Sequence, residues 1–198
     1  MQIGDKIKFG NYEWRVLDIQ NNTALVITEN IIETRPYHNR YVNTTWADCA
    51  LRKYLNGEFY DTFSEADRAK IMPVTNKNLD NQWYGTNGGE DTLDHIFLLS
   101  IEEAVCKYFG DSSKKLYNRG ITEKYWFQRK DENNHKRTAT FNGHGNSYWL
   151  RSPGRVKVKA VYVMRSGNIG IQGNNILEGN ISEPDYFGGV RPALWLSK

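Results

Sequence analysis

Cysteine and long hydrophobic runs are both scarce in this sequence of 198 residues. The two cysteines, Cys49 and Cys106, lie far apart, so they indicate no disulfide framework, although a single bridge between them stays open. No apolar run approaches the roughly 20 residues of a transmembrane helix, and the N-terminus MQIGDKIKFG lacks the apolar region of a secretory signal. We therefore expect a cytoplasmic protein, or a module of a longer chain, that does not contact a membrane.

A strong charge of one sign is also lacking, because the net charge is only +3. Residues 114–137 nevertheless carry eight basic and three acidic side chains, which gives +5 there and −2 in the rest of the chain. The same segment contains the aromatic residues Tyr117, Tyr125, Trp126 and Phe127. Cations and aromatics suit phosphates and bases, so nucleic-acid binding through 114–137 is one alternative. A solvated insertion has the same composition, and we favour it over a nucleic-acid partner.

Aromatic residues, in contrast, are abundant. They make up 13% of the chain, with 6 Trp and 12 Tyr, although the mean hydropathy is −0.69. Large aromatic side chains fill a core without long aliphatic runs. The composition therefore predicts a folded, loop-rich domain rather than a disordered chain.

Both ends of the chain have the alternation of β-strands. Residues 5–32 alternate apolar and polar side chains around a turn at Asn21-Asn22, which predicts an antiparallel meander. From residue 147, YWLRS, VKVKAVYVM and RSGNIGIQG predict a strand followed by a hairpin. The final VRPALWLS predicts a closing strand that pairs near the first ones.

Helix signals lie between these β regions. Thr45 with Asp48 predicts a helix start, and Asn56-Gly57 predicts its end. Ser64 with Asp67 repeats the capping pattern for a shorter helix.

A third helix signal follows a buried run. HIFLLS, residues 95–100, predicts a fully buried strand. Ser100 and Glu103 then form a capping box for a helix that ends at Gly110. Residues 111–146 have no clear period and predict a loop with short helical turns.

Four motifs occur together in a characteristic order: LRKYLNGEFYDTFSEADRAKI, IFLLSIEEAVCKYF, YWLRSPG and GGVRPALWL. In this combination the chain resembles an uncharacterised bacterial family of domains of unknown function, whose fold is similar to C-type lectins and formylglycine-generating enzymes. The resemblance implies one α+β domain over 1–198, with two main helices, a small twisted antiparallel sheet and long irregular loops. Its parts are a β meander (1–35), a helical part (44–110), a basic loop insertion (111–146) and a C-terminal β part (147–198).

The resemblance also suggests roles for the residues of the last two motifs. Trp149 and Trp195 would lie on core strands. Arg151 and Arg191 would be structural cations, hydrogen-bonded to loop carbonyls or acidic groups, because a guanidinium has five fixed donors.

The enzymes of this fold group use known catalytic residues, and we looked for the same residue types in this sequence. Formylglycine-generating enzymes use a cysteine pair late in the chain, and this sequence has no cysteine after Cys106. Its histidines (His38, His95, His135 and His144) lack metal-ligand spacing. We therefore expect no catalytic residue, no metal and no cofactor. An enzyme of the formylglycine-generating type with an unrecognised loop site remains the main alternative.

Carboxylate clusters give only weak signals. Glu183 and Asp185 flank Pro184 like part of a calcium-lectin loop, but the second half of that pattern is missing. Glu90, Asp91 and Asp94 are better explained as a solvated acidic loop. Calcium is therefore not expected.

The favoured hypothesis is a non-enzymatic recognition module for a protein or small ligand, including a glycan. Loops rich in Tyr, Asn and Arg combine flat apolar surfaces with adaptable hydrogen bonding. The resemblance places such a surface at about 155–187. The candidate ligand-binding residues are Tyr148, Arg155, Tyr162, Arg165, Asn168, Gln172, Asn174, Asn175 and Tyr186.

Overall fold

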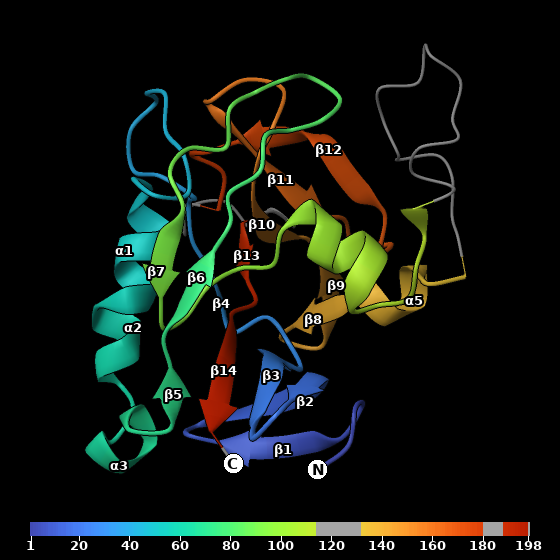
Figure 1. Ribbon diagram of the computed structural model, residues 1–198. Helices are drawn as coiled ribbons and strands as arrows, with labels where there is room; N and C mark the ends of the chain where they lie inside the picture. The colour runs from blue at the N-terminus through green and yellow to red at the C-terminus, as the bar shows by residue number, and fades with distance from the viewer. Residues whose placement is uncertain (114–131, 180–187, 198) are drawn as a thin grey trace.

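The computed structural model describes residues 1–113, 132–179 and 188–197, and this part of the chain is mostly β (Figure 1). The first of two five-stranded sheets has the order β1-β2-β3-β14-β5, and all of its pairs are antiparallel. Its strands are β1 (Lys6–Phe9), β2 (Tyr12–Gln20), β3 (Thr23–Thr28), β14 (Ala193–Ser197) and β5 (Ile71–Met72). The last strand of the sequence therefore pairs directly with the N-terminal meander.

The second sheet has the order β12-β11-β10-β13-β4. Its strands are β12 (Ile169–Asn175), β11 (Lys159–Val163), β10 (Tyr148–Pro153), β13 (Gly189–Val190) and β4 (Glu33–Thr34). Strands β10 and β13 are parallel, whereas the other pairs are antiparallel. Residues 188–197 thus supply β13 to this sheet and β14 to the first.

Two hairpins complete the β structure. One pairs β6 (Val74–Asn76) with β7 (Thr92–Asp94), and the other pairs β8 (Ala139–Phe141) with β9 (His144–Asn146). The β8–β9 turn is Asn142-Gly143, and both residues have positive φ, of 50° and 80°. Asn-Gly favours this two-residue turn, so the sequence did contain a hairpin signal within the predicted loop 111–146.

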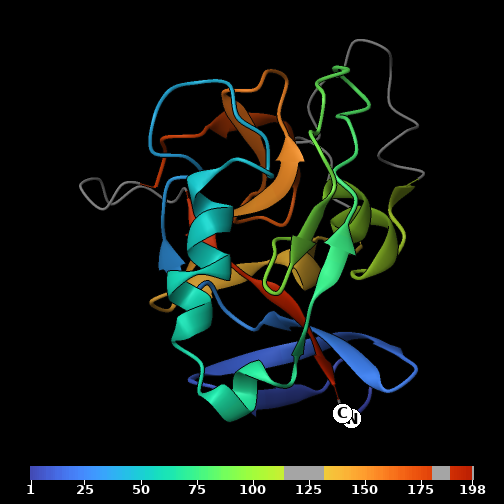
Figure 2. The ribbon, with the colours of Figure 1, turned by 60° about the vertical axis from the view of Figure 1, so that its left-hand side comes forward.

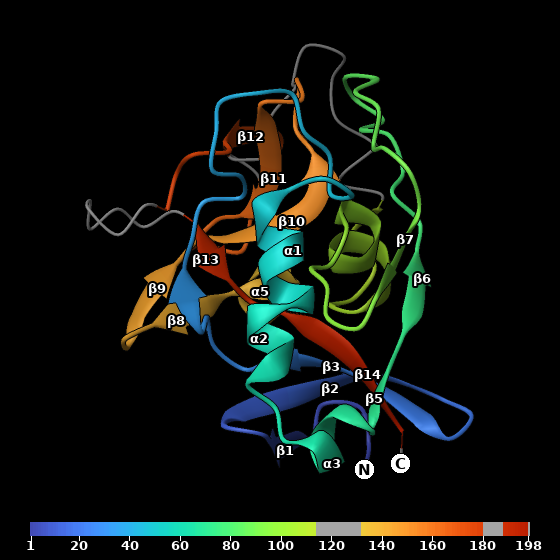
Figure 3. The same ribbon diagram turned by 90° about the vertical axis from the view of Figure 1, so that its left-hand side faces the viewer.

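The helices in the described parts of the chain are short. They are α1 (Ala50–Asn56), α2 (Glu58–Asp61), α3 (Glu65–Arg68), the π-helix η1 (Glu103–Lys107) and α5 (Asn134–Arg137). Figures 2 and 3 show α1 and α2 along one side of the molecule, between a first sheet at one end and the second sheet at the other. A membrane-crossing helix needs about 20 apolar residues, and none of the described helices approaches this.

The predicted fold class is wrong. Among the described helices only α1 reaches seven residues, so there are no two main helices, and several small sheets replace the single one. A C-type-lectin-like α+β fold is therefore not supported. Gly57 ends α1 after two turns, and the helix predicted after Ser100 is wound as the short π-helix η1.

Two local predictions are also wrong. Thr45 does not cap α1; the Sγ atom of Cys49 accepts the first hydrogen bond instead, from the Arg52 backbone N–H at 3.3 Å. Residues 95–100 are largely buried as expected, but they form no strand, and only Phe97 makes a single bridge, to Ala193. Burial alone did not distinguish a strand from an irregular buried segment.

The core connects the two sheets. Trp14, Trp46 and Trp149 are fully buried, and each indole N–H donates a hydrogen bond of 2.9–3.0 Å. Tyr37 packs between the last two, with ring centroids 6.2 Å from Trp46 and 5.8 Å from Trp149. The high aromatic content is therefore core material, because each large ring fills volume while its polar atom is satisfied.

Candidate functional site

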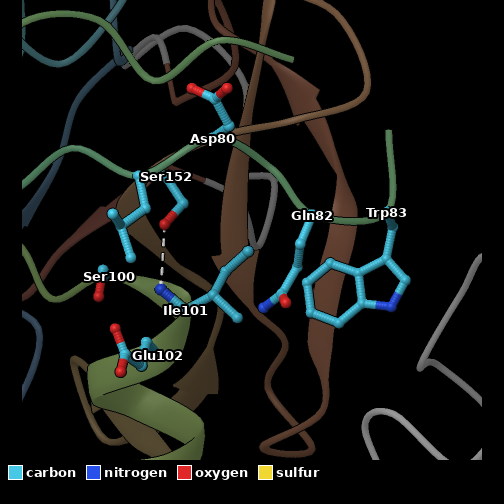
Figure 4. Close-up of a pocket in the computed structure, with 8 residues that line it drawn as sticks. Asp80, Gln82, Trp83, Ser100, Ile101, Glu102 and Ser152 are labelled. Atoms are coloured by element: carbon cyan, nitrogen blue, oxygen red, sulfur yellow. Dashed lines mark hydrogen bonds between the residues drawn. The ribbon is translucent and has the colours of Figure 1, made fainter. Parts of the chain in front are cut away.

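Two adjoining cavities lie beside the start of η1, between the loop that carries residues 77–83 and strand β10. The first has a volume of about 280 Å³, and the second of about 240 Å³. They share the wall residues Leu79, Ser100 and Glu102, and we call them together the η1 groove. Figure 4 shows the first cavity, which is lined by Leu79, Asp80, Gln82, Trp83, Ser100, Ile101, Glu102 and Ser152.

A capping box fixes the helical wall of the groove. The Ser100 backbone N–H donates to the Glu103 carboxylate at 2.8 Å, and the Glu103 N–H donates to Ser100 Oγ at 3.2 Å, so this prediction is confirmed. The Ile101 N–H donates to Ser152 Oγ at 3.0 Å, the bond drawn in Figure 4. The helix start is thereby attached to strand β10, and its π winding is of a kind found often at functional sites.

A buried ion pair lies behind this wall. Arg151 Nη1 donates to the Leu98 carbonyl at 2.8 Å and to Glu103 Oε2, and Nη2 donates to Glu103 Oε1 at 3.0 Å. Burial alone would raise the pKa of Glu103, but the Arg151 charge and hydrogen bonds and the Ser100 N–H outweigh it and lower that pKa. Glu103 is therefore a carboxylate at neutral pH and does not act as a proton donor.

The opposite wall is held by Asn81, which is buried. Its Nδ2 donates to the carbonyls of Pro153 and Ile171, at 2.9 and 2.8 Å, and its Oδ1 accepts from the Trp83 backbone N–H at 3.1 Å. These bonds join the loop to β10 and β12. As a result, Trp83 and Gln82 lie across the cavity from Ser100 (Figure 4).

Eight of the nine predicted ligand-binding residues lie in the described part of the chain, and none of these eight lines the η1 groove. Tyr148, Tyr162 and Asn168 are buried, Arg155 and Arg165 are exposed, and Gln172, Asn174 and Asn175 are partly buried, while Tyr186 lies outside the described residues. The Oδ1 atom of Asn174 accepts from the Asn175 N–H at 2.9 Å, and that of Asn175 from the Leu177 N–H at 3.0 Å. These two amides therefore support a local turn.

The four predicted structural residues lie on the strands or at their ends. Trp149 and Arg151 are on β10, Trp195 is on β14, and Arg191 is between β13 and β14. Arg151 and Trp195 also line the second cavity of the groove. Arg191 lines a different cavity, described below.

Sequence reasoning did not find the residues that line the first cavity. In the sequence, the loop NKNLDNQWYGTNGGEDTLD has only the composition of a polar loop. Its one signal was Trp83, a large aromatic side chain in a loop that otherwise consists mostly of Asn, Gly and Asp.

In the part of the chain that the structure describes, the thiols and carboxylates show no arrangement for nucleophilic or metal chemistry. Burial raises the pKa of Cys49 to about 12 and also raises that of Cys106, and neither forms a disulfide. Within the described residues, no group of three His, Cys, Asp or Glu side chains could hold a metal ion. Asp94 is fully buried, so its assignment to a solvated acidic loop is wrong.

Two alternatives lie largely outside the described residues. Glu183 and Asp185, the partial calcium motif, belong to 180–187. Most of the basic segment 114–137 falls within 114–131, and only its end, which includes α5, is described.

Comparison with known proteins gives one match. A family model described as Domain of unknown function (DUF6273) matches residues 21–198. No curated protein and no solved structure matches the chain. The predicted membership of a domain-of-unknown-function family is therefore confirmed at that level: the chain belongs to the DUF6273 family.

Proposed function

We propose that this protein is a recognition module that binds a small polar ligand of the glycan type in the η1 groove. The observation that carries the proposal is the combination of an indole, Trp83, with carboxylate, amide and hydroxyl groups around one cavity (Figure 4). An indole face packs on the apolar face of a sugar ring, and the polar groups match its hydroxyls.

The composition of the groove supports binding rather than catalysis. The residues that line its two cavities include no histidine and no cysteine. The hydroxyl oxygens of Ser100 and Ser152 each accept a backbone hydrogen bond at a helix start, which is a structural role. A nucleophile needs an adjacent general base, and such a pair is not present among these lining residues.

The attachment of both walls supports a preformed site. Asn81 holds the Trp83 loop on β10 and β12, and the capping box with Ser152 holds the helical wall on β10. A site that is already ordered loses less conformational entropy when a ligand binds.

Binding of chito-, cello-, xylo- and malto-oligosaccharides, followed by NMR titration, tests the proposal. We expect one class to shift the resonances of Trp83 and Gln82, and Trp83→Ala to weaken its binding about tenfold or more. Trp83→Phe should restore part of the affinity. The control is Tyr41→Ala, which removes an exposed aromatic side chain outside the groove and should leave binding unchanged. Absence of binding by all four classes, or equal affinity of Trp83→Ala and wild type, would contradict the proposal.

A further inference from the structure

A third cavity, of about 590 Å³, lies between the first sheet, the residues after η1, and the α5–β8 segment. Arg191, from the conspicuous GGVRPALWL motif, lines it, and we call it the Arg191 cavity. Arg15 and Lys136 are also among its lining residues.

The Arg191 guanidinium is buried, yet no carboxylate of residues 1–113, 132–179 or 188–197 balances its charge. Its Nε donates to the Thr28 carbonyl at 2.9 Å, and Nη1 donates to the Arg137 carbonyl and the Tyr148 hydroxyl, both at 3.2 Å. Nη2 donates a single bond, to the Glu29 carbonyl at 3.2 Å, although it carries two hydrogens. Within the described residues Arg191 forms no ion pair, in contrast to Arg151 with Glu103.

The other charges around the cavity add to this positive charge. Glu29 supplies the only carboxylate among the lining residues, and it already binds Arg15 at 2.5 Å and Lys6 at 3.1 Å. Although burial alone would raise the pKa of Glu29, these hydrogen bonds and charges lower it, so Glu29 is ionised and neutralised by its partners. Arg191 and Lys136 therefore have no carboxylate counterpart in the lining.

The rest of the cavity wall is largely apolar. Ile3, Val16, Leu17 and Phe109 contribute to it. A ligand that fits both features has an anionic head for Arg191 and a hydrocarbon body for these side chains.

From these observations we infer that the Arg191 cavity binds a small organic anion, a carboxylate or phosphate carried on an apolar body. The ligand head lies at Arg191 Nη2 and within reach of Lys136. Occupation would supply the counter-charge that a buried guanidinium otherwise lacks. This site is separate from the η1 groove and does not depend on the function proposed for it.

Calorimetric titration of the full chain with hexanoate, hexyl phosphate, inorganic phosphate and the neutral 1-hexanol tests the inference. We expect one of the two hexyl anions to bind at least tenfold more tightly than 1-hexanol and than inorganic phosphate. The stronger of the two identifies the head group. Binding should weaken as salt is raised, because the interaction is between charges.

Two substitutions in the lining of the Arg191 cavity should change the affinity for the hexyl anion in opposite directions. Glu29→Gln removes the only carboxylate of the lining and should tighten binding of the hexyl anion about threefold, a gain that misfolding cannot produce. Lys136→Ala should weaken it about threefold, whereas Lys53→Ala, an exposed lysine outside the cavity, should not change it. Equal binding of 1-hexanol and the anions, or no effect of Glu29→Gln and Lys136→Ala, would overturn the inference.

Discussion

The carboxylate of Asp94, fully buried on β7, accepts a 2.6 Å hydrogen bond from the Arg52 guanidinium on α1. Trp46, Asn76 and Thr92 also donate to this carboxylate, at 2.7–3.0 Å. One side chain therefore joins α1, the segment before it and the β6–β7 hairpin.

Removal of this carboxylate should strongly destabilise the fold. Asp94→Ala leaves the Arg52 charge and three buried donors unsatisfied, so we expect a loss of about 3–5 kcal/mol in the free energy of unfolding, measured in urea. Asp91→Ala, three residues earlier and exposed, is the control and should change it by less than about 0.5 kcal/mol. Similar losses for both variants would show that the buried network is not important.

The second prediction concerns the contribution of the Arg151–Glu103 pair to the free energy of unfolding. Glu103→Gln leaves a buried guanidinium without its counter-charge and should cost about 3–5 kcal/mol. The double variant Arg151→Met with Glu103→Leu should be less destabilised than the sum of the single variants, because neither charge remains. Urea unfolding of the wild type, Arg151→Met, Glu103→Leu and the double variant gives the coupling energy, and strictly additive losses would refute the prediction.

His38 should make stability depend on pH. Its Nδ1 accepts the Ala50 backbone N–H at 3.1 Å, and burial, Arg40 and Lys53 lower its pKa from the ordinary 6.5. The unfolded chain then binds the proton more readily than the folded one, so stability is complete above 6.5 and falls as the pH decreases below it.

In the wild type, the urea concentration at the midpoint of unfolding should fall from pH 7.5 to pH 5, because His38 becomes protonated more readily in the unfolded chain. The decline should be smaller in His38→Asn, whose Oδ1 replaces the acceptor without titrating near neutrality. His144→Asn changes an exposed histidine and should retain the full decline. Identical profiles for His38→Asn and wild type would exclude His38 as the cause.

Gly88 is required where the loop of Trp83 approaches itself. A Cβ there would overlap the backbone carbonyls of Asn78 and Leu79, which cannot move aside like a flexible side chain. Gly88→Ala should therefore cost about 1–3 kcal/mol and weaken ligand binding in the η1 groove. Gly145→Ala, whose Cβ would meet only ordinary contacts at 3.9 Å, should have little effect on thermal unfolding or binding. Wild-type stability of Gly88→Ala would show that the loop adjusts freely.

Local patterns in the sequence predicted local structure well. The Ser100–Glu103 capping box, the Ser64 cap and the β11–β12 hairpin all depend on residues close in sequence, and all three form. The Asn142-Gly143 turn is equally local, but it lies in a segment whose charge and lack of period predict only a loop.

The candidate site was not predictable in this way. Asn81 bonds to carbonyls 72 and 90 residues further along the chain, and Arg151 pairs with a glutamate 48 residues earlier. No pattern within a loop reveals such partners, because they depend on how the sheets are assembled. The fold class failed because the helices are shorter than their signals predict: α1 ends at Gly57 as expected but starts only at Ala50, and the helix expected up to Gly110 ends as η1 at Lys107.

The position of residues 188–197 in both sheets has a consequence for the order of folding. Strand β14 separates β3 from β5, and β13 separates β10 from β4, so neither sheet is continuous without this segment. During synthesis, the meander β1–β3 can form early, but β14 reaches β3 only after more than 160 intervening residues have been made, among them the whole β10–β12 unit. Such long-range pairing is slow. The nascent chain therefore exposes the unpaired edge of β3 to the cell until residues 188–197 emerge, and protection of that edge by a chaperone would matter most during this interval.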